Sequence, residues 1–204
     1  MKKSYIGLII GLIIIIVYSE VNNRVLDNTN IVVDYNKYLE SELNTLRGFK
    51  VNDNLDLVLT KVKYRNMYGS DLVIYRGFND YLKKGDAILS NDGLVGIVKK
   101  TYSDSSVVDL ITSRDSAISV SIGDYYGILK CINNELVITG INNYSNINMG
   151  DKIYTSGLGN INKGIYVGSV KNIVLSDTGI EKIIYVDIGN RLNNLNYLYI
   201  WRSL

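Results

Sequence analysis

The triplet Asp177-Thr178-Gly179 has the residue types and order of a known catalytic signature. Asp-Thr-Gly is typical of aspartic proteases, in which two carboxylates share one proton, so a single copy per chain would need a dimer to complete the site. The following residues, Ile180 and Glu181, differ from the alanine and small polar residue usual in those enzymes. A hairpin turn between two strands explains the triplet fully, and we favour that interpretation.

Other residue types restrict the chemistry further. The chain contains no histidine, which excludes His-dependent triads and removes the commonest general base and metal ligand. A serine nucleophile activated by a lysine stays open as an alternative, although the sequence indicates no particular serine–lysine pair. The single cysteine, Cys131, is interpreted as a small apolar strand residue, and the glycine-rich run 157–164 as a connection between strands. We therefore predict no catalytic residue, no cofactor and no metal site.

Composition limits the class of protein. With 204 residues, 47% of them hydrophobic, the chain can form one or two small domains with buried cores. The 22 basic and 20 acidic residues leave a net charge of +2. This balance argues against nucleic acid as the main partner, because nucleic-acid binding usually needs a basic face.

Short runs rich in Val, Ile and Tyr recur along the second part of the chain, with polar turns between them and no long helical period. About a dozen such runs predict a mainly β fold built as small barrels or sandwiches. We expect strands at residues 55–62, 72–76, 86–90, 94–99, 106–112, 117–122, 127–132, 135–139, 152–155, 165–175, 182–188 and 197–201.

Two parts of this region resemble each other. Gly85-Asp86 opens a strand that is followed by a turn at Asp92-Gly93 and by Val95-Gly96-Ile97-Val98. About 65 residues later Gly150-Asp151 opens a strand that is followed by glycine-containing turns and by Val167-Gly168-Ser169-Val170. Two β units of related build explain the recurrence, and two unrelated hairpins with ordinary turn chemistry are the alternative.

The N-terminus carries an uncharged, almost wholly apolar run at residues 5–18, preceded by Lys2 and Lys3. As a helix it would span about 21 Å, and the flanking tyrosines Tyr5 and Tyr18 could lie in the two interfaces. A signal peptide has an apolar core of similar length, but no small-x-small cleavage site follows. We predict an uncleaved transmembrane signal anchor at residues 1–19, with a cytoplasmic N-terminus and the bulk of the chain outside the cytoplasm.

Residues 20–50 have helical character and are predicted to form a coiled-coil stem. Seven of nine heptad positions between residues 21 and 49 are apolar, which favours a homodimer, while a single amphipathic helix packed on the β region is the alternative. The positions are Val21, Val25, Asn28, Val32, Tyr35, Leu39, Glu42, Leu46 and Phe49.

Five blocks of the β region, in order and spacing, resemble the family of the bacterial rod shape-determining protein MreC. The blocks are 92–98 (DGLVGIV), 106–112 (SVVDLIT), 127–129 (GIL), 150–159 (GDKIYTSGLG) and 163–170 (KGIYVGSV). The predicted anchor and stem lie where that family has them. The predicted stem is shorter than is usual in that family, and residues 160–163 stand where the family commonly has Phe-Pro.

The resemblance implies a protein of the bacterial cytoplasmic membrane with two small β-barrels within residues 51–204, divided at about residues 115–130. It also implies a non-enzymatic scaffold of the cell-elongation machinery that organises peptidoglycan synthases and so maintains cell shape. The implied partners are MreD, RodA, a class B penicillin-binding transpeptidase and the MreB system. Two alternatives stay open: a membrane-tethered hydrolase that uses Asp177 or a serine–lysine pair, and a module that binds cell-wall glycan.

Overall fold

The computed structural model describes residues 37–39, 41–43, 57–66, 70–159 and 161–202, and the chain divides into two compact units, 1–49 and 50–204. In the first unit, residues 37–39 and 41–43 are helical, as the stem prediction requires at those positions. The predicted anchor and the remainder of the predicted stem lie outside the described residues. Among the residues that are described, no helix has the length and apolar character needed to cross a membrane.

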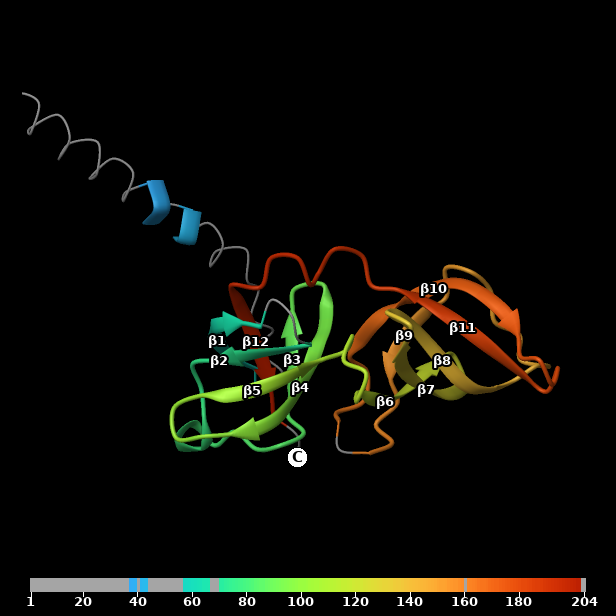
Figure 1. Cartoon of the computed structure of the whole chain (residues 1–204), viewed down its shortest axis with the longest axis horizontal. Helices are drawn as coiled ribbons and strands as arrows, with labels where there is room; N and C mark the ends of the chain where they lie inside the picture. The colour runs from blue at the N-terminus through green and yellow to red at the C-terminus, as the bar shows by residue number, and fades with distance from the viewer. Residues whose placement is uncertain (1–36, 40, 44–56, 67–69, 160, 203–204) are drawn as a thin grey trace, which may run out of the picture. The chain divides into compact units, whose positions relative to one another are not determined.

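Six strands of the second unit form a closed antiparallel barrel, barrel 1, in the order β1-β12-β3-β4-β5-β2 (Figure 1). Its strands are β1 (Leu57–Arg65), β2 (Asp71–Ile74), β3 (Ala87–Ser90), β4 (Gly93–Thr101), β5 (Ser106–Leu110) and β12 (Tyr197–Trp201). A short 3-10 helix, η1 (Phe78–Asp80), follows β2.

The other six strands form barrel 2, closed in the order β10-β11-β8-β7-β6-β9. Its strands are β6 (Ala117–Ile122), β7 (Tyr125–Ile132), β8 (Glu135–Asn142), β9 (Lys152–Thr155), β10 (Tyr166–Leu175) and β11 (Glu181–Asp187). The prediction of a mainly β fold with two small barrels is confirmed, and each of the twelve expected strands coincides with an observed strand to within a few residues.

The chain passes from barrel 1 to barrel 2 and later returns to barrel 1. A single domain boundary at about residues 115–130 accounts for only the first of these two crossings. The first crossing occupies residues 111–116, between β5 and β6. The second occupies residues 188–196, after which β12 pairs with β1 and β3 and closes barrel 1. Pairing between strands so distant in sequence leaves no local signal in the residues that make it.

The two barrels have the same order of strand neighbours. If β12 is placed ahead of β1, the sequence of pairings in barrel 1 matches that of β6 to β11 in barrel 2, so β3 corresponds to β9 and β4 to β10. The recurring blocks also make the same hydrogen bonds. Gly85 donates to Val98 and Val98 to Asp86 (both 2.9 Å), while Gly150 donates to Val170 (2.8 Å) and Val170 to Asp151 (2.9 Å). The recurrence therefore reflects two units of related build.

The glycine of each Val-Gly-x-Val block allows two backbones to approach closely. A Cβ atom on Gly96 would lie 2.3 Å from the carbonyl oxygen of Asp109 on β5, and one on Gly168 would lie 2.4 Å from that of Asp187 on β11. Neither distance is compatible with a side chain, so each barrel needs glycine at this point.

Leucine and β-branched side chains fill each barrel. Ile74, Ile88 and Leu94 are completely buried in barrel 1, as are Ile138 and Ile184 in barrel 2. Alternate residues along each strand point inward and outward, so these apolar side chains occupy the interior of small barrels without leaving a channel.

We predict that Gly96→Ala lowers the free energy of unfolding by about 1–3 kcal/mol, because the added methyl group must displace β5. Gly168→Ala should have a similar effect in barrel 2. Urea denaturation measures both, and the fluorescence of the single tryptophan, Trp201 on β12, reports on barrel 1. Ser169→Ala, beside Gly168, is the matched control. An unchanged denaturation midpoint for both glycine variants would contradict the close approach of the strands.

Candidate functional site

The Asp177 triplet lies in the turn between β10 and β11, with the side chain of Asp177 exposed. The turn is closed by a hydrogen bond from the amide of Gly179 to the carbonyl of Ser176 (2.8 Å), and Gly179 has a φ of +68°. The hydroxyl groups of Ser176 and Thr178 lie 3.1 Å apart. These contacts account for the triplet as a hairpin turn, the interpretation that the sequence favoured.

At two places among the described residues, a lysine that lies near a serine makes a contact with another group. Lys84 and Lys99 line a groove of about 580 Å³ together with Ser116, but the ammonium of Lys99 lies 3.6 Å from the carboxylate of Asp109. Near the far end of barrel 2 the ammonium of Lys182 donates to the carbonyl oxygen of Ser145, and not to its hydroxyl. Lys99 and Lys182 therefore contact groups other than a serine hydroxyl. A serine–lysine hydrolase would need the lysine to contact the hydroxyl of the serine nucleophile.

Cys131 lies on β7 with only 7% of its surface exposed. This burial agrees with the interpretation of Cys131 as a small apolar strand residue. The run 157–164 connects β9 to β10, and its ends are joined by hydrogen bonds from Thr155 to Ile165 (2.8 Å) and from Gly164 to Thr155 (2.9 Å). The prediction of a connection between strands is therefore confirmed.

The junction between the barrels contains a buried arginine that the sequence did not single out. Arg191 is 7% exposed and lies on the return crossing 188–196. Its Nε donates to the carbonyl of Ile188 (3.0 Å), and its Nη1 donates across the junction to the carbonyl of Leu94 on β4 (3.4 Å). The guanidinium carbon lies 5.3 Å from the centre of the Tyr166 ring on β10. One side chain thus contacts a strand of each barrel.

At the junction, burial and the neighbouring groups shift the pKa of Arg191 in opposite directions. Burial lowers the pKa of the Arg191 guanidinium, while Tyr166 and the nearby carboxylates of Asp92 and Asp187 favour its charged form. Arginine stays ionised under physiological conditions, so its burial requires the partners that the junction supplies. A groove of about 490 Å³ with Asp92 and Asp187 on its walls borders the guanidinium and leaves it access to water on one side.

Gly93 allows the barrels to meet at this point. The sequence predicts a glycine turn at Asp92-Gly93, and Gly93 has the required positive φ of +126°. A Cβ atom here would also lie 2.3 Å from the carbonyl oxygen of Tyr166 and 2.5 Å from Nη1 of Arg191. The same glycine therefore forms the hairpin turn of barrel 1 and leaves room for barrel 2.

The outward face of β7 exposes apolar side chains. Tyr126, Ile128 and Ile132 are 51%, 43% and 46% exposed, and one exposed lysine, Lys130, lies between the two isoleucines on the same face. Tyr126 pairs with Ser121 and Ile128 with Ser119, and these small residues of β6 leave the apolar side chains uncovered. We call Tyr126, Ile128 and Ile132 the β7 face. Exposed apolar surface of this kind is typical of protein interaction sites.

We predict that Arg191→Ala lowers the stability of barrel 1 by about 1.5–3 kcal/mol and separates the unfolding of the two barrels, because the charged hydrogen bond to Leu94 and the contact with the Tyr166 ring are lost. Arg191→Lys should rescue little, since lysine lacks the planar fork that reaches both carbonyls. Trp201 fluorescence follows barrel 1, and circular dichroism follows both barrels. Arg114→Ala, an exposed arginine on the first crossing, is the control. Coincident transitions in Arg191→Ala would contradict a coupling role.

We also predict that Asp177→Asn changes the free energy of unfolding by less than about 0.5 kcal/mol, because the side chain is exposed. The wild-type chain and the variant should show the same background rate on a peptide library, followed by mass spectrometry. Cleavage that disappears in the variant would restore the aspartic protease hypothesis.

Comparison with known proteins gives one family. A sequence profile described as Rod shape-determining protein MreC, barrel core, matches residues 61–202, which include nearly all of both barrels. The cell shape-determining protein MreC of Streptococcus pneumoniae (strain ATCC BAA-255 / R6) is 31% identical over 120 residues. The match covers 54% of this chain and 44% of that relative, so the chain spans less than half of the relative's length.

Solved structures have the same fold. MreC from Listeria monocytogenes superposes with a TM-score of 0.69 at 23% identity, over 89% of this chain and 92% of that chain. MreC in a complex with penicillin-binding protein PBP2 from Helicobacter pylori superposes with a TM-score of 0.56 at 21% identity, over 72% and 98% of the two chains. Because the family profile matches more than half of the chain and includes both closed barrels, the chain belongs to the MreC family of rod shape-determining proteins.

Proposed function

We propose that this protein is a non-enzymatic scaffold of the cell-elongation machinery, which organises peptidoglycan synthases and so maintains cell shape. The observation that carries the proposal is the family match over residues 61–202, the part of the chain that builds both barrels. The scaffold reading agrees with the contacts of Asp177, Lys99 and Lys182, which have structural explanations.

The proposed partners are a class B penicillin-binding transpeptidase, RodA, MreD and the MreB system. Support for the transpeptidase comes from the Helicobacter pylori relative, which was solved as a complex with a penicillin-binding protein. The other partners follow from the family alone. The proposal also includes the membrane anchor at residues 1–19, a cytoplasmic N-terminus, and a homodimer formed through the stem at residues 20–50.

Two features of the barrels suit a scaffold. The Arg191 junction links a strand of each barrel, so that surfaces on both barrels can be presented in a defined geometry. The β7 face offers exposed aromatic and aliphatic side chains to a protein partner. An anchored partner in the same membrane would be at high effective concentration, so a modest contact area would be sufficient. We propose the β7 face as the contact for the transpeptidase.

We expect the full-length chain, purified by affinity from gently solubilised membranes of its host, to recover a penicillin-binding transpeptidase, RodA or MreD. The double variant Tyr126→Ser and Ile128→Ser should recover about tenfold less transpeptidase, because a combined loss of about 1.4 kcal/mol from two central apolar contacts corresponds to a factor of about ten. Quantitative mass spectrometry measures the recovery.

Tyr144→Ser is the matched control, since Tyr144 is 90% exposed on the same barrel but lies outside the β7 face. Equal recovery with both variants would exclude the β7 face while preserving the scaffold. Purification of the chain alone, even after mild crosslinking in cells, would contradict the scaffold. Binding of the purified protein to isolated cell wall would then favour the glycan-binding alternative.

A further inference from the structure

One end of barrel 1 combines exposed aromatic side chains with lysines. β1 begins and β12 ends at this end, because Leu57 pairs with Trp201, and β3 also begins here, with Ala87 beside Trp201. η1 and the turn 102–105 lie at the same end, joined by hydrogen bonds from Phe78 to Tyr102 (2.8 Å) and from Asn79 to Ser103 (3.2 Å).

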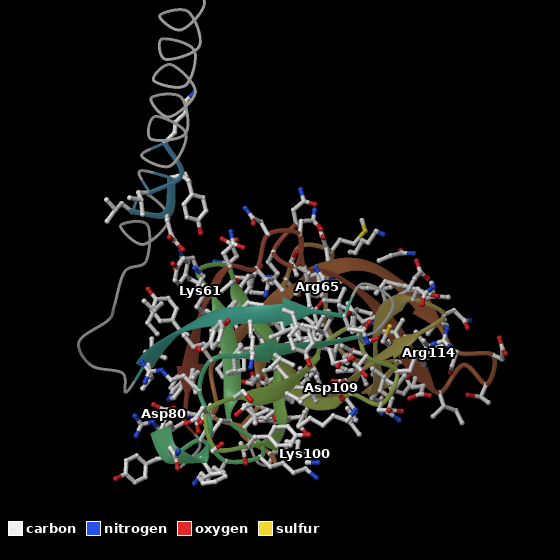
Figure 2. The ribbon with its side chains drawn as sticks, turned by 60° about the vertical axis from the view of Figure 1, so that its left-hand side comes forward. Lys61, Arg65, Asp80, Lys100, Asp109 and Arg114 are labelled. Atoms are coloured by element: carbon white, nitrogen blue, oxygen red, sulfur yellow. The ribbon has the colours of Figure 1, made fainter. Side chains whose placement is uncertain are left out.

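We define the basic aromatic surface by six residues of this end. Its aromatic members are Phe78, Tyr81 and Tyr102, which are 57%, 81% and 45% exposed. Its basic members are Lys83, Lys84 and Lys100, all exposed. Lys100 and Asp80, which are labelled in Figure 2, mark this end of the barrel.

Neither packing nor backbone geometry explains why residue 81 is a tyrosine. Its side chain is largely in solvent, and its φ of +65° lies in the left-handed region, where a bulky residue is unfavourable. Glycine or asparagine would suit this C-cap of η1 better. An exposed tyrosine held in an unfavourable conformation indicates a role outside the fold.

The nearby carboxylates are engaged by their own surroundings. Asp80 pairs with Arg76 (2.6 Å) and accepts from the amide of Gly77 (3.1 Å), and the Arg76 hydrogen bond lowers the pKa of Asp80. Asp86 is completely buried, and Asp104 accepts from the side chain of Asn79 (3.1 Å).

Within the described part of the chain Lys83, Lys84 and Lys100 form no ion pair, and Lys100 lies over the Tyr102 ring, 4.8 Å from its centre. Lys84 shares a groove with Asp109 and Asp115, of which Asp109 is paired with Lys99. With Arg76 paired to Asp80, the three lysines and Arg202 outnumber the carboxylates of Asp86 and Asp104, so this end of the barrel presents a net positive charge.

The composition of this surface distinguishes between two kinds of partner. Protein interfaces are enriched in aromatic residues but depleted of lysine. Surfaces that lie on a bilayer combine lysine with tyrosine and phenylalanine, because the ammonium groups attract anionic headgroups while the rings enter the interface. We propose that the basic aromatic surface docks on the anionic surface of the membrane that anchors the chain.

This inference deepens the proposed function, because it relies on the predicted anchor at residues 1–19 to keep the chain at a bilayer. The connector 20–56, which includes the predicted stem, leads from that anchor to Leu57, where β1 enters barrel 1 at the same end as the basic aromatic surface. Tethering would raise the local concentration of this end at the lipid surface, so even weak docking would be populated.

The test uses the full-length chain in lipid nanodiscs, in a Cys131→Ala background. A single cysteine introduced by Tyr81→Cys carries a fluorophore, and lipids with spin labels in their headgroups quench it on contact. Tyr144→Cys on barrel 2 is the matched site, because Tyr144 is 90% exposed and Tyr81 is 81% exposed. Discs are prepared with neutral lipid alone and with about one third phosphatidylglycerol, at low and high salt.

We expect strong quenching at Tyr81→Cys in anionic discs, weaker quenching in neutral discs or at high salt, and little at Tyr144→Cys. Replacing Lys83, Lys84 and Lys100 with glutamine should reduce the ratio of docked to undocked chains by about fivefold for each lysine replaced. Circular dichroism and Trp201 fluorescence check that this variant keeps its fold.

The remaining outcomes would overturn the proposal in distinguishable ways. Chains that incorporate into discs without quenching at Tyr81→Cys would show that the connector holds the surface away from lipid, and the scaffold function would stand. Equal quenching at both sites, or equal quenching in neutral discs, would exclude docking by this charged surface. If the fluorophore at Tyr81→Cys is shielded from solvent only when a transpeptidase is added, the surface binds a protein partner and not lipid. Chains that do not enter discs would contradict the predicted anchor and membrane docking, while the family match that carries the scaffold proposal would stand.

Discussion

Closure of each six-stranded sheet on itself is the constraint on which the rest of this structure depends. Barrel 1 can close only if β12, the last strand of the chain, pairs with both β1 and β3. The return crossing 188–196 must therefore run from β11 back to barrel 1, and it carries Arg191 into the junction. The junction is thus a consequence of how barrel 1 closes, and its arginine links the two barrels because of where that crossing runs.

Closed barrels also determine how such a protein can bind others. Each of the twelve described strands has two neighbours, so neither barrel leaves a strand edge for a partner to pair with through its backbone. Recognition must use outward-facing side chains instead. The β7 face and the basic aromatic surface are two such regions, on different barrels and of different chemistry. The first is apolar and suits a protein, and the second adds lysines and suits lipid headgroups. A scaffold that contacts both a partner and a membrane needs two distinct surfaces of this kind.

Local chemistry predicted much of the fold. Alternating apolar residues gave the strands, because a strand with one buried face has a period of two. The turn at Asn133-Asn134 also has a local cause, since both asparagines have positive φ values, 52° and 65°, and connect β7 to β8 in a two-residue hairpin. The recurring glycines, and the close backbone approach that they allow, also follow from local chemistry. The partner of each glycine does not, because the carbonyl of Asp109 that excludes a side chain at Gly96 lies on another strand.

The sequence by itself determined the mainly β class, the twelve strands, the related build of the two units and the family, because each of these is encoded in residues close together along the chain. Only the tertiary structure decided the return of β12, the burial of Arg191 between the barrels and the gathering of Phe78, Tyr102 and Lys84 at one end of barrel 1. These features join residues that are distant in sequence. An arginine in a polar loop has the same local pattern whether it is exposed or buried, so the distinction depends on what packs against it.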